Sequence, residues 1–213
     1  MALDITRFEL GPIGTNCYVA RRPNAPDAVV VDPSGDAAEI RLEIAGRGAR
    51  CSAILVTHGH WDHLGAVADL AEGTGAPVHM ADDEAVLLEH VNDYVPPGVR
   101  VRPWSPDVRL AGDETLELAG LSWDVLRVPG HSPAHLAFAT EGALFSGDVL
   151  FAGSVGRTDL PGSDPETLFA SIRALADRFP PETTIYPGHG TPTTLGHELA
   201  TNPFLAELRA TRR

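Results

Sequence analysis

The chain has 213 residues, of which 43% are hydrophobic and 21% are charged, a composition typical of a globular protein that can bury a substantial core. Its formal net charge of −13 argues against binding to nucleic acid or to an anionic membrane surface, because both depend mainly on Lys and Arg. We expect a cytoplasmic protein without a signal peptide. No segment approaches the roughly 20 apolar residues of a spanning helix, and the first residues contain no basic stretch.

The N-terminal part of the chain predicts several short strands and one helix. Apolar runs predict strands over residues 3–10, 17–20, 28–31 and 52–56, with a turn over 11–16. The second and third strands are expected to form an antiparallel hairpin or meander. Apolar positions at helical spacing after an acidic start predict a helix over 36–45. We expect Cys17 and Cys51 to be small buried residues with free thiols.

Three histidines and one aspartate occur within six residues, directly after an apolar strand. Residues two apart face the same way on a strand, so His58 and His60 are expected to point at one spot. The chain then turns, which lets Asp62 and His63 face a second spot nearby. Neutral imidazole and carboxylate groups suit zinc, iron or manganese. The alternative is that Asp62 caps a helix and the histidines are ordinary loop residues.

The rest of the chain predicts further strands and helices. Helices are expected over 62–72, 82–90, 165–179 and after Asn202-Pro203, and strands over 77–80, 108–110, 115–118, 123–128, 135–139, 143–145 and 183–186. Residues 92–107 are rich in Pro and Gly and predict a long loop that lines or covers a site. Two sheets packed face to face, with helices outside, satisfy this order of elements.

Three further strands end in a Gly-rich turn that carries a possible ligand, as the histidine cluster does. The three residues are His131, Asp148 and His189. Glycine beside each of them permits a tight turn and close backbone approach. A single turn of this kind is as easily a plain turn as a ligand site, but three matching turns favour a shared function. We expect them to meet the histidine cluster at one edge of the sandwich.

The combined pattern T-H-x-H-x-D-H, G-H, G-D and G-H-G resembles that of the metallo-β-lactamase superfamily, over essentially the whole chain. The resemblance implies an α/β (α+β) protein with the αββα sandwich fold. Such a fold has two mixed β-sheets, helices on both outer faces and a metal site at one edge, here in a single domain over residues 1–213. It also implies two divalent metal ions, with zinc expected in preference to iron or manganese. By this resemblance the first ion would be held by His58, His60 and His131, the second by Asp62, His63 and His189, and Asp148 would bridge them.

Other stretches narrow the resemblance. Residues 153–162 and 186–190, with the Thr201-Asn202-Pro203 tail, are similar to the short, single-domain glyoxalase II-like hydrolases of bacteria. The implied activity is hydrolysis of a thioester of the hydroxyacylglutathione type by a water molecule activated between two metal ions. The implied partner is a small-molecule thioester or related substrate, with the protein as a monomer or homodimer.

Two residues would act on the substrate or the water. Asp62 is the carboxylate best placed to orient the attacking water. Arg157 would bind a substrate carboxylate as a bidentate fork, or else form an ion pair with Asp159. Longer glyoxalase II proteins have a lysine and a tyrosine where this chain has Arg157 and Asp159. They also have a longer C-terminal helical region that helps to hold glutathione.

Other functions remain open. The Gly-Arg-Thr-Asp sequence at 156–159 is shared with persulfide dioxygenases, for which His58, His131 and Asp148 would supply the facial triad of a mononuclear iron site. A lactonase or β-lactamase-like hydrolase is a further alternative. Many lactonases of this fold have a tyrosine shortly after the bridging aspartate, where this chain has Val149, Leu150 and Phe151. The net charge opposes a nuclease, and the size of the ligand set opposes a non-enzymatic binding module.

Four more histidines lie outside the pattern. His79, His90 and His197 are expected to be surface or packing residues. His135 follows His131 by four residues and is a candidate for orienting a metal ligand.

Overall fold

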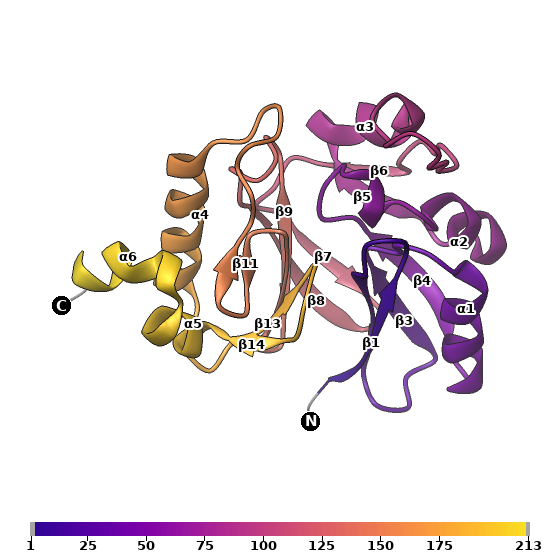
Figure 1. Cartoon of the computed structure of the whole chain (residues 1–213). Coiled ribbons are helices and arrows are strands. Elements are labelled where there is room, and N and C mark those ends of the chain that lie inside the picture. Colours follow the sequence, from indigo (N-terminus) through magenta and orange to yellow (C-terminus); the bar gives the residue numbers. More distant parts are fainter. Residues whose placement is uncertain (1–2, 212–213) are drawn as a thin grey trace.

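Two six-stranded β-sheets lie face to face, and helices cover both of their outer surfaces (Figure 1). This is the arrangement in the computed structural model, which describes residues 3–211. The αββα sandwich expected from the sequence is therefore confirmed. The prediction of one domain over 1–213 includes four terminal residues that lie outside the described part of the chain.

The first sheet is mixed and has the strand order β1-β2-β3-β4-β5-β6. The β1/β2 and β2/β3 pairs are antiparallel, whereas β3/β4, β4/β5 and β5/β6 are parallel. Its strands are β1 (Asp4–Leu10), β2 (Thr15–Arg21), β3 (Asp27–Val31), β4 (Arg50–Leu55), β5 (Val78–Ala81) and β6 (Val108–Leu110). The predicted hairpin of the second and third strands is confirmed.

The second sheet is also mixed and has the order β14-β13-β10-β9-β8-β7. Only the β10/β13 pair is parallel, so β8, β10 and β13 all run in one direction. Its strands are β7 (Thr115–Leu118), β8 (Leu121–Arg127), β9 (Leu136–Thr140), β10 (Ala143–Gly147), β13 (Thr184–Pro187) and β14 (Thr193–Thr194). A two-stranded hairpin of β11 (Leu150–Phe151) and β12 (Ser154–Val155) follows β10.

The helices divide between the two outer faces (Figure 1). On the first sheet lie α1 (Ala37–Gly46), α2 (Val67–Thr74) and α3 (Ala85–Glu89), and on the second α4 (Pro165–Arg178), α5 (Leu195–Thr201) and α6 (Ala206–Thr211). Short 3₁₀ turns occupy Trp61–His63, Asp82–Glu84, Val91–Asp93 and Pro203–Leu205. Within residues 3–211, no helix has both the length and the apolar character that crossing a membrane requires.

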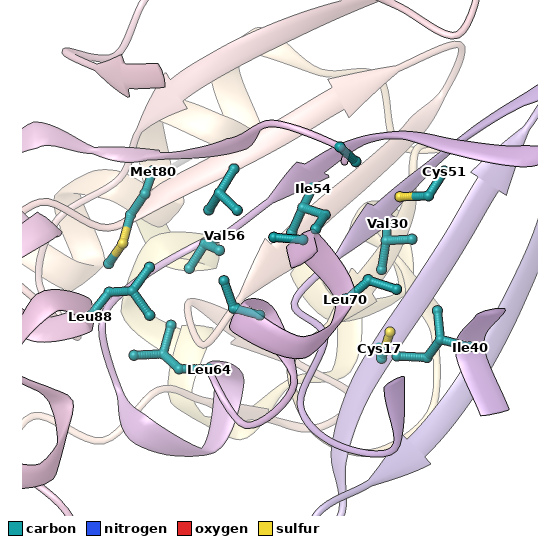
Figure 2. Close-up of a cluster of buried hydrophobic side chains, with 14 of the residues drawn as sticks. Cys17, Val30, Ile40, Cys51, Ile54, Val56, Leu64, Leu70, Met80 and Leu88 are labelled. Atoms are coloured by element: carbon teal, nitrogen blue, oxygen red, sulfur yellow. The ribbon is translucent and has the colours of Figure 1, made fainter. Parts of the chain in front are cut away.

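Alternate residues of the central strands enter different hydrophobic layers. Val29 faces the layer between the two sheets, whereas Val30 faces the layer beneath α1 and α2. Figure 2 shows the latter layer, in which Ile40 of α1 and Leu70 of α2 pack over the strands. Both faces of these strands are buried, which explains their continuous apolar runs. Cys17 and Cys51 belong to this layer as free thiols, as predicted.

Two predicted boundaries near the histidine cluster are wrong. The helix predicted over 62–72 begins only at Val67, because residues 61–63 form a separate 3₁₀ turn and Asp62 caps no helix. The turn predicted over 11–16 ends earlier, since Thr15 and Asn16 are the first residues of β2. The first difference buries two predicted ligands, Asp62 and His63, and the second buries the side chains of Thr15 and Asn16.

Candidate metal centre

All the predicted ligands follow the C-terminal ends of strands. His58 to His63 follow β4, while His131, Asp148 and His189 follow β8, β10 and β13 respectively. The last three strands run in the same direction, so their C-terminal ends meet at one edge of the second sheet. Two backbone hydrogen bonds join the sheets at this edge, Leu136 N to Thr57 O at 2.8 Å and Asn16 N to Gly188 O at 2.7 Å.

The first group of side chains consists of His58, His60 and His131. Nδ1 of His60 lies 3.0 Å from Nε2 of His58 and 2.9 Å from Nε2 of His131. A ring nitrogen holds at most one proton, so His60 Nδ1 cannot donate to both neighbours. Two nitrogens bound tetrahedrally to one zinc ion would be about 3.3 Å apart, close to these separations. The three nitrogens therefore converge as the ligands of a cation do.

The second group consists of Asp62, His63 and His189. Oδ2 of Asp62 lies 3.4 Å from His63 Nε2 and 3.3 Å from His189 Nε2. Asp148 lies between the two groups: Oδ1 is 3.4 Å from His63 Nε2, and Oδ2 is 3.5 Å from both His131 Nε2 and His189 Nε2. The structure thus brings all seven predicted ligands together.

Neighbouring groups determine which ring nitrogens carry protons. The Thr57 hydroxyl donates its hydrogen to Asp32, so it can only accept one from His58 Nδ1, 3.0 Å away. His131 Nδ1 donates to the carbonyl of Arg157 at 2.9 Å, and His63 Nδ1 donates to Asp32 Oδ2 at 2.9 Å. Each Nε2 is left with a lone pair aimed at the centre.

Burial and charge shift the pKa values of the ligands in opposite directions. Burial, with the neighbouring histidines, lowers the pKa of His58 well below its usual value and that of His60 to about 4. Burial alone would lower the pKa of His63, but Asp148 and Asp32 raise it well above its usual value. Burial would raise the pKa of Asp62, but the His189 hydrogen bond and the charge of His63 lower it to about 2. The carboxylates of Asp148 and Asp32 thus favour positive charge at His63, which either a proton or a metal cation on Nε2 would supply.

The donor set fits a pair of cations. His63 Nε2 and Asp148 Oδ1 are both buried and have no hydrogen-bond partner. Leaving buried polar atoms unpaired is costly, and a cation between them would satisfy both. Gly188 leaves the necessary space, because a Cβ there would lie 2.1 Å from Asp148 Oδ1. Imidazole and carboxylate ligands suit zinc, iron and manganese.

Three supporting residues were missed from the sequence. Asp32 directly follows the strand predicted over 28–31, and its carboxylate accepts bonds from the Thr57 backbone N–H, the Thr57 hydroxyl and His63. Thr15 donates to Asp62 Oδ2 at 2.7 Å. The third residue is Glu84, which is buried although it lies among exposed acids. The position of Asp32 at the end of β3, the parallel neighbour of β4, is the signal that could have identified it.

The other histidines lie where the sequence predicts. His79 is buried, with Nδ1 near the carbonyl oxygens of Ile54 and Pro77, whereas His90 and His197 are exposed. His135 stacks on the ring of His58, and its Nε2 accepts a hydrogen bond from the backbone N–H of Asp148. It therefore contacts two predicted ligands, and its role in orienting them stays a prediction.

A cavity of about 980 Å³ opens beside the ligand cluster. His60, Asp62, His131, Asp148 and His189 form one part of its wall. Tyr94 and Pro96 belong to the wall as well, so the predicted loop over 92–107 does line the site. Arg157 also reaches the cavity, where its Nε and Nη2 donate to the two carboxylate oxygens of Asp159 at 2.6 and 2.7 Å. The ion pair considered from the sequence is thus present.

The comparisons with known proteins agree on one family. Residues 10–189 match the model of the metallo-β-lactamase superfamily. Hydroxyacylglutathione hydrolase GloC of Haemophilus influenzae is 34% identical over 187 residues, which cover 84% of this chain and 87% of that protein. The crystal structure of BLEG-1 B3 metallo-β-lactamase has a TM-score of 0.90 at 36% identity, covering 95% of this chain and 100% of that one. The crystal structure of TTHA1623 in a di-iron-bound form has a TM-score of 0.75 at 40% identity, covering 94% of this chain and 100% of that one. The chain belongs to the metallo-β-lactamase superfamily.

Proposed function

We propose that this protein hydrolyses thioesters of the hydroxyacylglutathione type with two divalent metal ions. The observation that carries the proposal is the pair of ligand groups that share Asp148 at the edge of a cavity. The relationship to hydroxyacylglutathione hydrolase GloC supports a thioester as the substrate. Zinc is the proposed metal, and the likeness to the di-iron form of TTHA1623 supports iron as its rival.

The seven ligands divide as the two groups suggest. In this proposal His58, His60 and His131 would hold the first ion and Asp62, His63 and His189 the second, while Asp148 would contribute to both. Two divalent cations at such a site lower the pKa of a bound water from 15.7 toward about 7 and polarise the acyl carbonyl. Asp32, Thr57 and the Arg157 carbonyl hold the histidines in the tautomer that ligation requires.

Asp62 is the proposed catalytic carboxylate. Its pKa of about 2 keeps it ionised at neutral pH, so it can accept a hydrogen bond from the attacking water. The Thr15 hydroxyl holds Oδ2 of Asp62, which fixes the orientation of the carboxylate at the cavity wall. A thiolate can leave without a proton from the protein, because the ordinary pKa of a thiol is about 8.5. Arg157 is proposed to bind a carboxylate of the substrate in exchange for Asp159.

We also propose a cytoplasmic protein that acts on a small molecule as a monomer or homodimer. The two buried free thiols, Cys17 and Cys51, are in keeping with a reducing compartment. The net charge of −13 is unfavourable for partners that carry many phosphates.

The test is turnover of S-D-lactoylglutathione by protein loaded with zinc, manganese or iron. We expect activity that follows metal content, with about two ions per chain, and a loss of at least roughly 100-fold in an Asp62→Asn variant. A rate no greater than that of the same metal in buffer would remove S-D-lactoylglutathione as the substrate.

Two rival activities can be tested on the same preparation. The likeness to BLEG-1 B3 metallo-β-lactamase favours β-lactam hydrolysis as a second candidate, which a chromogenic cephalosporin would report. Persulfide oxidation by a mononuclear iron site at His58, His131 and Asp148 would instead appear as oxygen uptake with glutathione persulfide. An iron content near one per chain would accompany it.

A further inference from the structure

The cavity beside the ligand cluster has mostly apolar walls. They come from separate segments: Ile13 precedes β2, Val86 and Leu87 belong to α3, Tyr94 lies in the loop after it, and Phe151 ends β11. The structure describes five large hydrophobic side chains that are strongly exposed, and three of them are on this wall: Ile13 at 56%, Val86 at 47% and Tyr94 at 54%. Exposed apolar side chains gathered in one cavity indicate a binding surface for an apolar group.

Two of these side chains lie directly against the ligands. Leu87 packs on Gly59, between His58 and His60, so closely that a Cβ on this glycine would be 2.5 Å from Leu87 Cδ1. The ring of Phe151 meets the ring of His189 edge to face, with centroids 6.1 Å apart. An apolar group bound on this wall therefore begins next to the ligand cluster, where the reacting acyl carbon of a substrate would lie.

The charged groups of the cavity, other than the ligands, are already paired. Asp83 accepts a hydrogen bond from Arg127 at 2.6 Å, and the buried Glu84 accepts one from Ser132. Arg157 is the single cation among the cavity residues, and both of its bonds go to Asp159. This exposed pair is weak and can exchange partners with one anion. Among the described residues that line the cavity, there is no second Lys or Arg side chain for another carboxylate.

Glutathione carries two carboxylates and little apolar surface, so it matches this wall poorly. We propose that the cavity selects substrates by a bulky apolar acyl group and accepts at most one carboxylate on the thiol that carries it. The preferred substrates are then thioesters of medium-chain or aromatic acids on a thiol with few charges. This inference rests on the proposed thioester hydrolysis and specifies its substrate class.

A matrix of four substrates tests the inference on the metal-loaded wild-type protein. D-Lactoyl and hexanoyl groups are each presented on glutathione and on N-acetylcysteamine, and kcat/KM is measured for all four. Each methylene buried on the wall is worth about fourfold in binding. We therefore expect hexanoyl to exceed lactoyl by at least tenfold on either thiol, mainly through KM, and glutathione to give no advantage over N-acetylcysteamine.

The outcomes separate the two proposals. If lactoylglutathione is the best of the four substrates, the apolar selection is wrong and thioester hydrolysis stands. Equal rates with lactoyl and hexanoyl groups would have the same meaning. If none of the four is hydrolysed faster than by metal in buffer, both proposals fall.

A pair of variants tests whether the apolar wall of the cavity causes the preference for apolar acyl groups. Val86→Lys places a cation at an exposed position of the cavity, while Leu42→Lys makes the same change at a 73% exposed position on α1. In Val86→Lys, kcat/KM for hexanoyl-N-acetylcysteamine should fall about fivefold and that for lactoylglutathione should rise, whereas Leu42→Lys should match the wild type. Equal substrate ratios in the two variants would contradict the assignment of this wall.

Discussion

At the scale of single residues, Glu84 joins the two loops that carry the first ligand group. Its carboxylate accepts hydrogen bonds from Gly59 N at 2.6 Å, Ser132 Oγ at 2.5 Å and Ala134 N at 2.8 Å. Gly59 separates His58 from His60, and Ser132 follows His131. A buried carboxylate is tolerated only where hydrogen bonds compensate for its lost hydration. Here those bonds fix the distance between two ligand-bearing loops.

Glu84→Gln should therefore loosen the first ligand group. The amide keeps one accepting oxygen and presents an NH₂ group to donors that need an acceptor. We expect the free energy of unfolding to fall by about 2–3 kcal/mol and metal affinity to fall about tenfold. Chemical denaturation and competitive metal titration would measure the two effects. Glu39→Gln makes the same change at an exposed site on α1, and identical behaviour of the two variants would contradict the role of Glu84.

At the scale of elements, the sequence predicts where the ligand-bearing strands end, but it does not predict the residues that hold the ligands in position. An apolar run that stops at glycine identified the strands before His58, His131, Asp148 and His189, because both signals are local in sequence. The helix boundary near Asp62 depends on a contact between distant segments. Gly65 approaches Ser34 so closely that a Cβ would lie 2.1 Å from the Ser34 carbonyl oxygen, and the next residue, Ala66, donates its backbone N–H to the Pro33 carbonyl at 2.8 Å before α2 begins.

The missed residues share the same cause. Thr15 lies in the stretch predicted as a polar turn, and only the pairing of β2 with β1 brings its hydroxyl to Asp62. Glu84 sits in a run of acids typical of a solvated helix start, and only the tertiary fold buries it between two loops. The short β11–β12 hairpin has too few residues to give a periodic pattern. Sequence patterns thus identify the predicted metal ligands, and the fold reveals the residues that orient those ligands.

The turn after β13 gives a prediction for this scale. A methyl group on Gly188 would lie 2.1 Å from Asp148 Oδ1 and 2.7 Å from His63 Cε1, within the ligand cluster itself. Gly188→Ala should remain folded, lose at least one metal ion per chain and retain roughly 1% of activity or less. Gly46→Ala in α1, where no atom lies within 4 Å of the added Cβ, should bind metal normally and be up to about 1 kcal/mol more stable. Full metal content in Gly188→Ala would contradict the ligand assignment.

At the scale of the whole molecule, the ligand cluster lies where the two halves of the sandwich meet. The first sheet contributes the ligands from His58 to His63, and the second contributes His131, Asp148 and His189. The layer between the two sheets is filled by apolar packing, as between Tyr18 and Phe145, whose ring centroids are 5.4 Å apart. Metal ions bound by ligands from both sheets would act as cross-links between the two halves.

Removing the metal should therefore destabilise the whole fold rather than one loop. A metal ion that binds only the folded chain, at a free concentration 1,000 times its Kd, adds about 4 kcal/mol of stability. For a chain of this size that corresponds to a Tm higher by roughly 8–16 °C than in chelator. Scanning calorimetry with and without EDTA measures the difference. An Asp148→Asn variant, which weakens the group shared by both ligand sets, should lose most of the metal-dependent shift. If the wild type binds metal and yet melts at one temperature in both conditions, the ligands do not join the two sheets, because a cation held by both halves must raise the cost of separating them.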